Sequence, residues 1–156
     1  MEVNIRNAEK KDMPQVLQLI KELAVFEKEP NAVEVTVTDL EVEGFKKNLF
    51  TCFVAEFEAE IVGMALVYFR FSTWKGRTVH LEDLIVKKEY RSKGIGTLLY
   101  NKVITFAKQQ GVKRVEWVVL DWNQNAIDFY EKSGATFLKN WYLVQLGEEE
   151  IKINDN

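Results

Sequence analysis

A strand that runs into a glycine-containing loop and then a long amphipathic helix is the feature that constrains the fold most. Residues 78–86 are predicted to form a strand, and the loop that follows contains Arg91-Ser92-Lys93-Gly94-Ile95-Gly96. Apolar residues then recur at helical spacing: Ile95, Leu98, Leu99, Val103, Phe106 and Ala107. Amides in the first turn of a helix have no acceptor inside the helix, and the helix dipole favours an anion there. The loop is therefore either a phosphate-binding loop helped by Arg91 and Lys93, or a glycine turn with solvated charges.

Two better-known phosphate loops fit this segment less well. A P-loop requires Gly-Lys-Ser/Thr after its glycines, whereas this chain has Gly96-Thr97-Leu98. A dinucleotide-binding fingerprint requires a third glycine, at the position where Leu99 stands.

Periodicity predicts the other elements of the chain. Asp12 is a suitable N-cap for a first helix that Pro30 ends, and Thr38 with Glu41 forms a capping-box pattern for a shorter second helix. The long helix ends at Gly111, and a short helix over 126–132 ends at Gly134. Strands are predicted over 3–6, 51–57, 61–71, 78–86 and 114–120, with one or two more within 136–146, and turns over 58–60 and 74–76. The tail from Gly147 onward is expected to be frayed and solvated, including Glu148, Glu149 and Glu150.

This order of elements predicts an α+β fold built as a single domain over residues 1–156. A chain of 156 residues with 47% apolar side chains has enough material for one packed core. The net charge of −3 argues against a protein held mainly by nucleic-acid phosphates.

Cysteine and histidine usage narrows the chemistry. Cys52 is the one cysteine of the sequence, so it has no disulfide partner. His80 is the one histidine, so the sequence has too few ligands for a Cys/His zinc site, and no metal is expected. The N-terminus lacks the pattern of a signal peptide, and the longest apolar run, 61–69, is too short to cross a bilayer. These features predict a cytoplasmic protein with no membrane partner.

A second segment carries a recognisable pattern. Asn123 follows a predicted strand and caps the short helix, and Tyr130 stands about one turn before Gly134. Together with the first segment, it resembles the GNAT superfamily of acyl-CoA-dependent N-acetyltransferases. Arg91-x-x-Gly94-x-Gly96 is similar to the pyrophosphate-binding signature of that family, and residues 123–134 are similar to its second cofactor motif.

Further segments resemble one branch of the family. Residues 19–24, 52–56 and 81–83 are similar to the diamine (spermidine/spermine) acetyltransferases. Residues 72–78 and 120–124 are more similar to their thialysine Nε-acetyltransferase relatives.

The resemblance implies a fold, a cosubstrate and an assembly. The fold would be a mixed sheet flanked by helices, with fourth and fifth strands that splay apart to admit the pantetheine arm of acetyl-CoA. The protein would be a homodimer with its acceptor site near the subunit interface. The acetyl group would pass directly to the primary amine of a small molecule in a ternary complex, without a covalent intermediate. Ser72-Thr73 replace an acidic residue and proline of the polyamine-acetylating members, which favours thialysine or a lysine-like amino acid over a long polyamine.

The resemblance also implies roles for individual residues. Glu82 would deprotonate the amine through a water molecule, Tyr130 would protonate the leaving thiolate, and the amides of residues 84–86 would hold the pantetheine and polarise the carbonyl. The predicted cofactor-binding residues are Leu84, Ile85, Val86, Arg91, Ser92, Lys93, Gly94, Ile95, Gly96, Thr97, Asn123, Gln124, Asn125, Ala126 and Tyr130. The predicted acceptor-binding residues are Phe26, Glu27, Trp74, Glu82, Asp83, Glu116, Trp117 and Val118.

Each of these assignments has a structural alternative. Tyr130 can be a core aromatic residue, and Glu82-Asp83 can be an inter-strand charge pair whose members point to opposite faces. Cys52 is expected to be a small core residue, and His80 shares a face with Glu82 but receives no role. A protein or peptide N-acetyltransferase and a non-enzymatic CoA-binding module remain as alternative functions.

Overall fold

The computed structural model describes residues 1–153, which fall into two compact units, one of residues 1–118 and the other beginning at Val119. The first unit holds the sheet and most of the helices. Its elements are β1 (Asn4–Asn7), η1 (Lys10–Asp12), α1 (Met13–Phe26), α2 (Val37–Glu41), η2 (Val42–Lys46), β2 (Thr51–Phe57), β3 (Glu60–Ser72), β4 (Gly76–Val86), η3 (Lys88–Tyr90), α3 (Ile95–Gln109) and β5 (Val115–Glu116). The second unit contains α4 (Gln124–Lys132) and α5 (Glu148–Ile153).

The five strands form one mixed sheet in the order β1-β2-β3-β4-β5. The first four strands pair antiparallel, and β5 lies parallel to β4. Helices flank the sheet, so the predicted α+β fold with a mixed sheet is confirmed.

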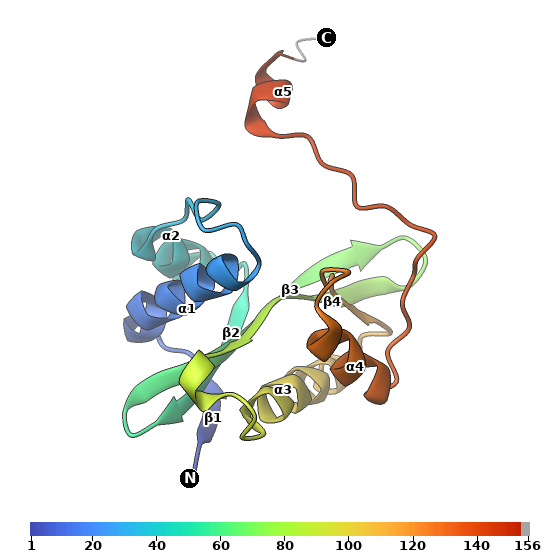
Figure 1. The fold of residues 1–156 in the computed structure, drawn as a ribbon. Coiled ribbons are helices and arrows are strands. Elements are labelled where there is room, and N and C mark those ends of the chain that lie inside the picture. The colour runs from blue at the N-terminus through green and yellow to red at the C-terminus, as the bar shows by residue number, and fades with distance from the viewer. Residues whose placement is uncertain (154–156) are drawn as a thin grey trace. The chain divides into compact units, whose positions relative to one another are not determined.

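Two apolar clusters cover the two faces of this sheet. The face toward α1 and α2 carries Cys52, Val54, Met64, Leu66 and Ile85, and the α3 face carries Phe53, Ala65, Val67, Val79 and Leu81. Figure 1 shows α1 and α2 on one side of strands β1 to β4 and α3 on the other. Cys52 is buried as expected, and burial raises the pKa of its thiol to about 12, which suits a core residue.

A bulge interrupts β4 at Glu82. Leu66 of β3 is the register partner of Asp83, and Val67 is the partner of Leu81, so Glu82 has no partner on β3. The extra residue changes which side chains face which helix. Val79 and Leu81 pack in the α3 cluster, but beyond the bulge Ile85 packs with α1 while Leu84 and Val86 pack with α3.

The fourth and fifth strands part early. Only Val79 with Val115 and His80 with Glu116 are paired, and β4 continues through Val86 without β5 beside it. The sequence predicted a strand over 114–120, but only Val115–Glu116 forms one. Residues 117–120 lie outside any strand of the described chain, although their apolar side chains suit one.

Two helix boundaries differ from the prediction. Asp12 stands at the N-cap position of α1, but its carboxylate accepts hydrogen bonds from the amide of Glu9 at 2.7 Å and from Arg6 at 2.7 Å instead of capping the helix. The helix ends at Phe26, before Pro30, and Lys28 adopts a left-handed conformation just after it. The capping box of α2 is made by Thr36 and Asp39, two residues earlier than the predicted pair of Thr38 and Glu41.

The C-terminal prediction was wrong in two places. No strand forms within 136–146, although the segment is rich in aromatic and β-branched residues. The polar tail is helical over Glu148–Ile153, with Lys152 and Glu148 paired at 2.8 Å one turn apart, whereas fraying was expected. Among the residues that the structure describes, no helix is both long and apolar enough to span a bilayer.

Candidate active site

Glu82 lies at the bulge of β4 with its carboxylate held by neighbours on its own sheet face. One of its oxygens, Oε2, lies 3.2 Å from Nε2 of His80 and accepts a hydrogen bond from the hydroxyl of Tyr68 at 3.4 Å. The hydrogen bond with His80 lowers the pKa of Glu82, and Tyr68 and the positive charge of Arg70 act in the same direction. The Glu82 side chain is half exposed and ionised at neutral pH.

Asp83 lies on the same face as Glu82, because the bulge reverses the alternation of β4. Its partner Leu66 belongs to the α1-side cluster, and its charge acts on Cys52 of that cluster. Burial raises the pKa of the Asp83 carboxyl to about 6, and the negative charges of Glu82 and Glu27 act in the same direction. The expectation that these two acids point to opposite faces was therefore wrong, since regular alternation does not hold across a bulge.

The backbone beyond the acids faces the gap left by β5. The amide of Lys87 donates to the carbonyl of Val62, and hydrogen-bonded pairs alternate along an antiparallel ladder. Ile85 therefore bonds to Met64 of β3, while the amides of Leu84 and Val86 point toward the edge where β5 has ended. Of the three predicted amides, this alternation leaves those of Leu84 and Val86 directed at the open edge.

The loop before α3 has the backbone of an anion site. Gly94 is the N-cap at φ 82°, no side chain caps the helix there, and Ser92 is also left-handed at φ 62°. A Cβ on Gly94 would meet nothing within 4 Å, and one on Gly96 would meet only Val86 Cγ2 at 3.9 Å. Neighbouring groups of the described chain therefore do not crowd the Cβ positions of these two glycines.

The two cations of this loop have different surroundings. Arg91 donates from Nε to the carbonyl of Val86 at 2.8 Å, and its guanidinium lies over the ring of Phe26 at 5.3 Å. Lys93 lies over the ring of Tyr90 at 5.4 Å and is exposed. Arg91 thus ties the loop to the end of β4, and Lys93 is the more accessible cation.

The predicted acceptor-binding residues lie in different places. Glu27 follows α1 and is close enough to raise the pKa of Asp83, and burial raises its own pKa. Glu116 is the register partner of His80 and lies on the side of the acids, where it contacts Arg70. Trp117 packs against Tyr100 of α3 with ring centroids 5.9 Å apart, which places it on the opposite face.

Two further members of that set are surface residues. Trp74 is 81% exposed in the β3–β4 turn, just before β4 begins at Gly76. At the rise of an extended chain, Gly76 lies about 20 Å along β4 from Glu82. Val118 is exposed just after β5. The chain itself does not bring Trp74 to the acids.

The second unit carries the other predicted cofactor motif. Asn123 caps α4 as expected, accepting a hydrogen bond from the amide of Ala126 at 3.3 Å. Gln124 and Asn125 form the first turn with Ala126, and Gln124 donates to Asp128 at 2.7 Å. Tyr130 lies in the last turn, with its ring 5.6 Å from that of Phe129. The carbonyl of Tyr130 accepts from the amide of Ala135, which closes the helix around Gly134.

Sequence reasoning missed two participants of the site, Arg70 and Tyr68. Both lie on the long strand β3 and reach the group around Glu82. The bulge had a sequence signal: the apolar residues Val79 and Leu81 are followed by Leu84 and Val86, so the alternation shifts by one residue.

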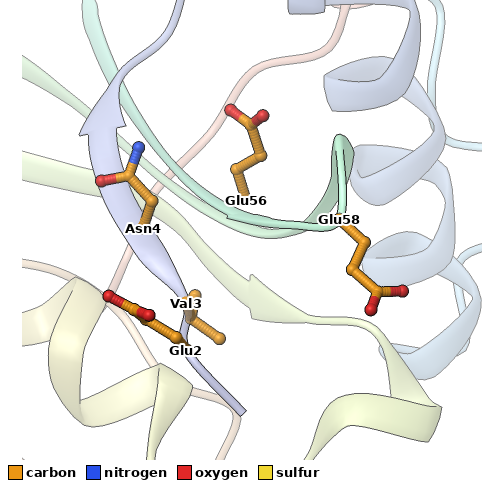
Figure 2. Close-up of a pocket in the computed structure, with 5 residues that line it drawn as sticks. All are labelled: Glu2, Val3, Asn4, Glu56 and Glu58. Atoms are coloured by element: carbon orange, nitrogen blue, oxygen red, sulfur yellow. The ribbon is translucent and has the colours of Figure 1, made fainter.

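A pocket elsewhere in the first unit holds none of these residues. It is lined by Glu2, Val3, Asn4, Glu56 and Glu58 at the β1–β2 edge of the sheet (Figure 2). Glu56 accepts a hydrogen bond from Arg6 at 2.5 Å, which gives that carboxylate a structural role. Within the described part of the chain, no group of three or more His, Cys, Asp or Glu side chains is arranged to hold a metal ion.

Comparison with known proteins shows which family the chain belongs to. Residues 13–135 match the family model described as Acetyltransferase (GNAT) family. The chain is 38% identical over 162 residues to the thialysine N-epsilon-acetyltransferase of Bos taurus, an alignment that covers 96% of this chain and 95% of the relative. It is 35% identical over 158 residues to the spermidine/spermine N(1)-acetyltransferase-like protein 1 of Homo sapiens, covering 94% of this chain and 23% of that protein.

A solved structure shares the fold. The crystal structure of a predicted acetyltransferase with acetyl-CoA from Clostridium acetobutylicum superposes with a TM-score of 0.76 at 18% identity, covering 92% of this chain and 96% of that one. The family model and the named relatives together show that the protein is an N-acetyltransferase. The chain belongs to the acetyltransferase (GNAT) family.

Proposed function

We propose that this chain transfers an acetyl group from acetyl-CoA to the primary amine of a small molecule, either a lysine-like amino acid such as thialysine or a diamine. The observation that carries the proposal is the pair Glu82 and Asp83, which lie on one sheet face where β4 continues without β5. The relative from Bos taurus, which matches over nearly the whole chain, is named for thialysine acetylation and supports this acceptor class.

The cofactor residues predicted from the sequence keep their proposed role. The uncapped start of α3 and its two open glycines fit the diphosphate of CoA, and Lys93 adds an exposed positive charge. The amides of Leu84 and Val86 suit hydrogen bonds to the pantetheine arm and the thioester carbonyl. Asn123 to Ala126 and Tyr130 keep the cofactor-binding role that the family motif implies.

The acids are proposed to bind and deprotonate the acceptor. A lysine-like amine has a pKa near about 10.4, so it arrives as an ammonium ion that ionised Glu82 attracts. A base works best when its pKa is near the working pH, which favours Asp83 over Glu82 as the final proton acceptor. We therefore propose that the proton leaves through a water molecule to the Glu82–Asp83 pair, a broader assignment than Glu82 alone.

The free amine then attacks the thioester carbonyl directly. The new C–N bond forms as the C–S bond breaks, the nitrogen loses its remaining extra proton to solvent, and the leaving thiolate takes a proton from the hydroxyl of Tyr130, which then regains one from solvent. This role for Tyr130 is inferred from the family motif, and both substrates are bound together in the reaction.

Arg70 favours an acceptor that also carries a carboxylate. Its side chain is 51% exposed beside the acids, and its charge acts on Glu82. The α-carboxylate of an amino acid would pair with the guanidinium, whereas a polyamine has no carboxylate for it to bind. Ser72, which the sequence comparison linked to acceptor choice, lies at the end of β3 next to the β3–β4 turn.

The proposal includes a homodimer with the acceptor site near the subunit interface. Apolar residues of the irregular segment before α5 are exposed in the single chain: Leu138, Trp141, Tyr142, Leu143, Val144 and Leu146. A stretch of this kind suits burial against a second copy. Sedimentation of the purified protein tests this, and a monomer at all concentrations argues against it.

A cytoplasmic location without nucleic-acid or membrane partners stays a prediction from composition.

An acceptor panel tests the function. Purified protein receives acetyl-CoA with thialysine, lysine, ornithine, spermidine, a short diamine or a basic peptide, and thiol release is followed. The proposal expects release with the lysine-like amines above the rate without an amine. Activity on the peptide alone supports a protein acetyltransferase instead, and CoA binding without turnover supports a non-enzymatic module.

A further inference from the structure

His80 lies at the centre of a polar chain that crosses three strands. Its ring is 8% exposed and is contacted on both nitrogens. Nδ1 is 3.2 Å from a guanidinium nitrogen of Arg70, and Nε2 is 3.2 Å from Oε2 of Glu82. The ring of Tyr68 lies against it with centroids 5.0 Å apart.

The contact with Arg70 determines where the proton of the neutral ring lies. A guanidinium only donates hydrogen bonds, so the atom that it contacts on His80 must accept one. Nδ1 therefore carries no proton, and the proton of the neutral imidazole is on Nε2. Nε2 then donates to Glu82.

Arg70 is itself held in place from the next strand. It contacts Glu116 of β5 at 3.1 Å, and Glu116 also contacts Arg114 at 3.4 Å. Glu116 and His80 are register partners in the short β4–β5 pairing. The pairing thus fixes Arg70 against His80.

Glu82 needs such an orientation more than a regular strand residue does. As the extra residue of the bulge it has no register partner on β3, and its side chain is half exposed. A hydrogen bond from a buried ring restricts that side chain far more than solvent does.

We propose that His80 is a positioning residue: held by Arg70 as the Nε2–H tautomer, it fixes the carboxylate of Glu82 at the bulge of β4. The catalytic consequence rests on the proposed function, but the tautomer does not. The charged and titratable groups around this ring are Arg70 and Tyr68 on β3, Glu116 on β5 with Arg114 just before that strand, and Glu82 and Asp83 on β4.

The tautomer can be read directly, because His80 is the one histidine of the chain. Long-range ¹H–¹⁵N correlation spectra of ¹⁵N-labelled protein near pH 8 distinguish the two neutral tautomers from the doubly protonated ring. The proposal expects a single Nε2–H species. An Nδ1–H ring or a doubly protonated ring overturns it, since neither can accept from Arg70.

Variants separate the hydrogen bond from packing. Arg70→Met removes the donor and should allow the Nδ1–H form to appear, whereas Arg77→Met, which removes an arginine stacked on Phe69, should leave the spectrum unchanged. The same spectrum from both variants as from the parent would contradict the role of Arg70.

Activity then tests the positioning. His80→Leu should lower kcat about 10- to 100-fold, the scale expected for a misplaced catalytic group, with a smaller change in KM. His80→Gln, which keeps an N–H donor of similar reach, should recover most of the loss. If His80→Leu does not fold, His80→Phe keeps a ring without the donor. Equal losses in the donor and non-donor variants indicate packing only and overturn the proposal. If no amine is acetylated by the parent, the proposed function fails while the spectra still decide the tautomer.

Discussion

Glu82 and Asp83 are adjacent in sequence and lie on the same face of the sheet. A regular strand would place them on opposite faces, but Glu82 is the extra residue of a bulge between the pairs Val67–Leu81 and Leu66–Asp83. Their pKa values are shifted in opposite directions, downward for Glu82 by His80 and upward for Asp83 by burial. This separation gives one ionised carboxylate and one that titrates close to neutrality.

The first prediction concerns the two acids. Glu82→Gln and Asp83→Asn should each lower kcat/KM for a lysine-like amine by about 10²-fold or more, the range of general base catalysis. In the parent, kcat/KM should rise with pH through about 6 as Asp83 loses its proton, and Asp83→Asn should remove that limb. Initial rates between pH 5 and 9 measure both effects. Glu43→Gln, which affects only an exposed pair with Lys47, is the control. A profile unchanged by Asp83→Asn contradicts this assignment.

The second prediction concerns stability. Because the pKa of Asp83 is raised in the folded state, folded protein binds more protons than unfolded protein between about pH 4 and 6. Stability from this group is therefore lost as the pH rises through that window. Asp83→Asn should be more stable than the parent at pH 8, by no more than about 3 kcal/mol, and the gain should vanish near pH 4. Denaturant unfolding at the two pH values measures this, and a variant less stable at pH 8 argues against a strained carboxylate.

The third prediction compares two glycines of the α3 loop. Gly94→Ala places a side chain at φ 82° and should cost about 1 kcal/mol of folding free energy. Gly96→Ala lies inside the first helical turn with room for its Cβ, so it should leave stability unchanged or slightly raised. Both variants should bind CoA more weakly, since the added methyl group would narrow the proposed diphosphate site. Calorimetric titration with CoA checks this, and full affinity in Gly96→Ala would remove the loop from the cofactor site.

The fourth prediction concerns Tyr130. Tyr130→Phe should reduce kcat by roughly 10²-fold if the hydroxyl protonates the leaving thiolate. CoA affinity should change little because the ring remains. Glu43→Gln, which alters an exposed pair with Lys47 away from the proposed site, serves as the control here as well. Unchanged turnover in Tyr130→Phe removes the general-acid role.

The fifth prediction concerns acceptor choice. Arg70→Gln should raise KM for lysine-like amino acids about tenfold, the effect of losing one charge-assisted hydrogen bond, and should not raise it for simple diamines. The ratio of kcat/KM for the two acceptor types is the quantity to compare. An equal change for both would mean that Arg70 does not contact the acceptor carboxylate.

The sequence is sufficient for the parts of the fold that depend on local pattern. Strand β2 has the predicted bounds, and the turn at Glu58–Ala59 forms as expected, with both residues left-handed. Asn123 caps its helix because capping depends on residues within one turn. Membership of the GNAT family also follows from short motifs that can be read in order along the chain.

Features that depend on a partner segment were not predictable in the same way. The bulge at Glu82 is a property of the register between β3 and β4, and the local alternation gives only a one-residue shift as a signal. The predicted strands over 114–120 and 136–146 contain suitable side chains, but a strand needs hydrogen-bond partners for its backbone. Arg70 and His80 are ten positions apart and come into contact because β3 and β4 pair as a hairpin. The hydrophobic periodicity of a single helix or strand does not reveal such a contact.

Product analysis tests the central claim most directly. The protein is incubated with isotopically labelled acetyl-CoA and thialysine, and the acceptor is examined by mass spectrometry while free thiol is counted. We predict one acetyl group on the side-chain amine for each thiol released, with both products greatly reduced in the protein that carries Glu82→Gln and Asp83→Asn. Equal acetylation by this double variant, or release of thiol without an acetylated amine, would contradict the account.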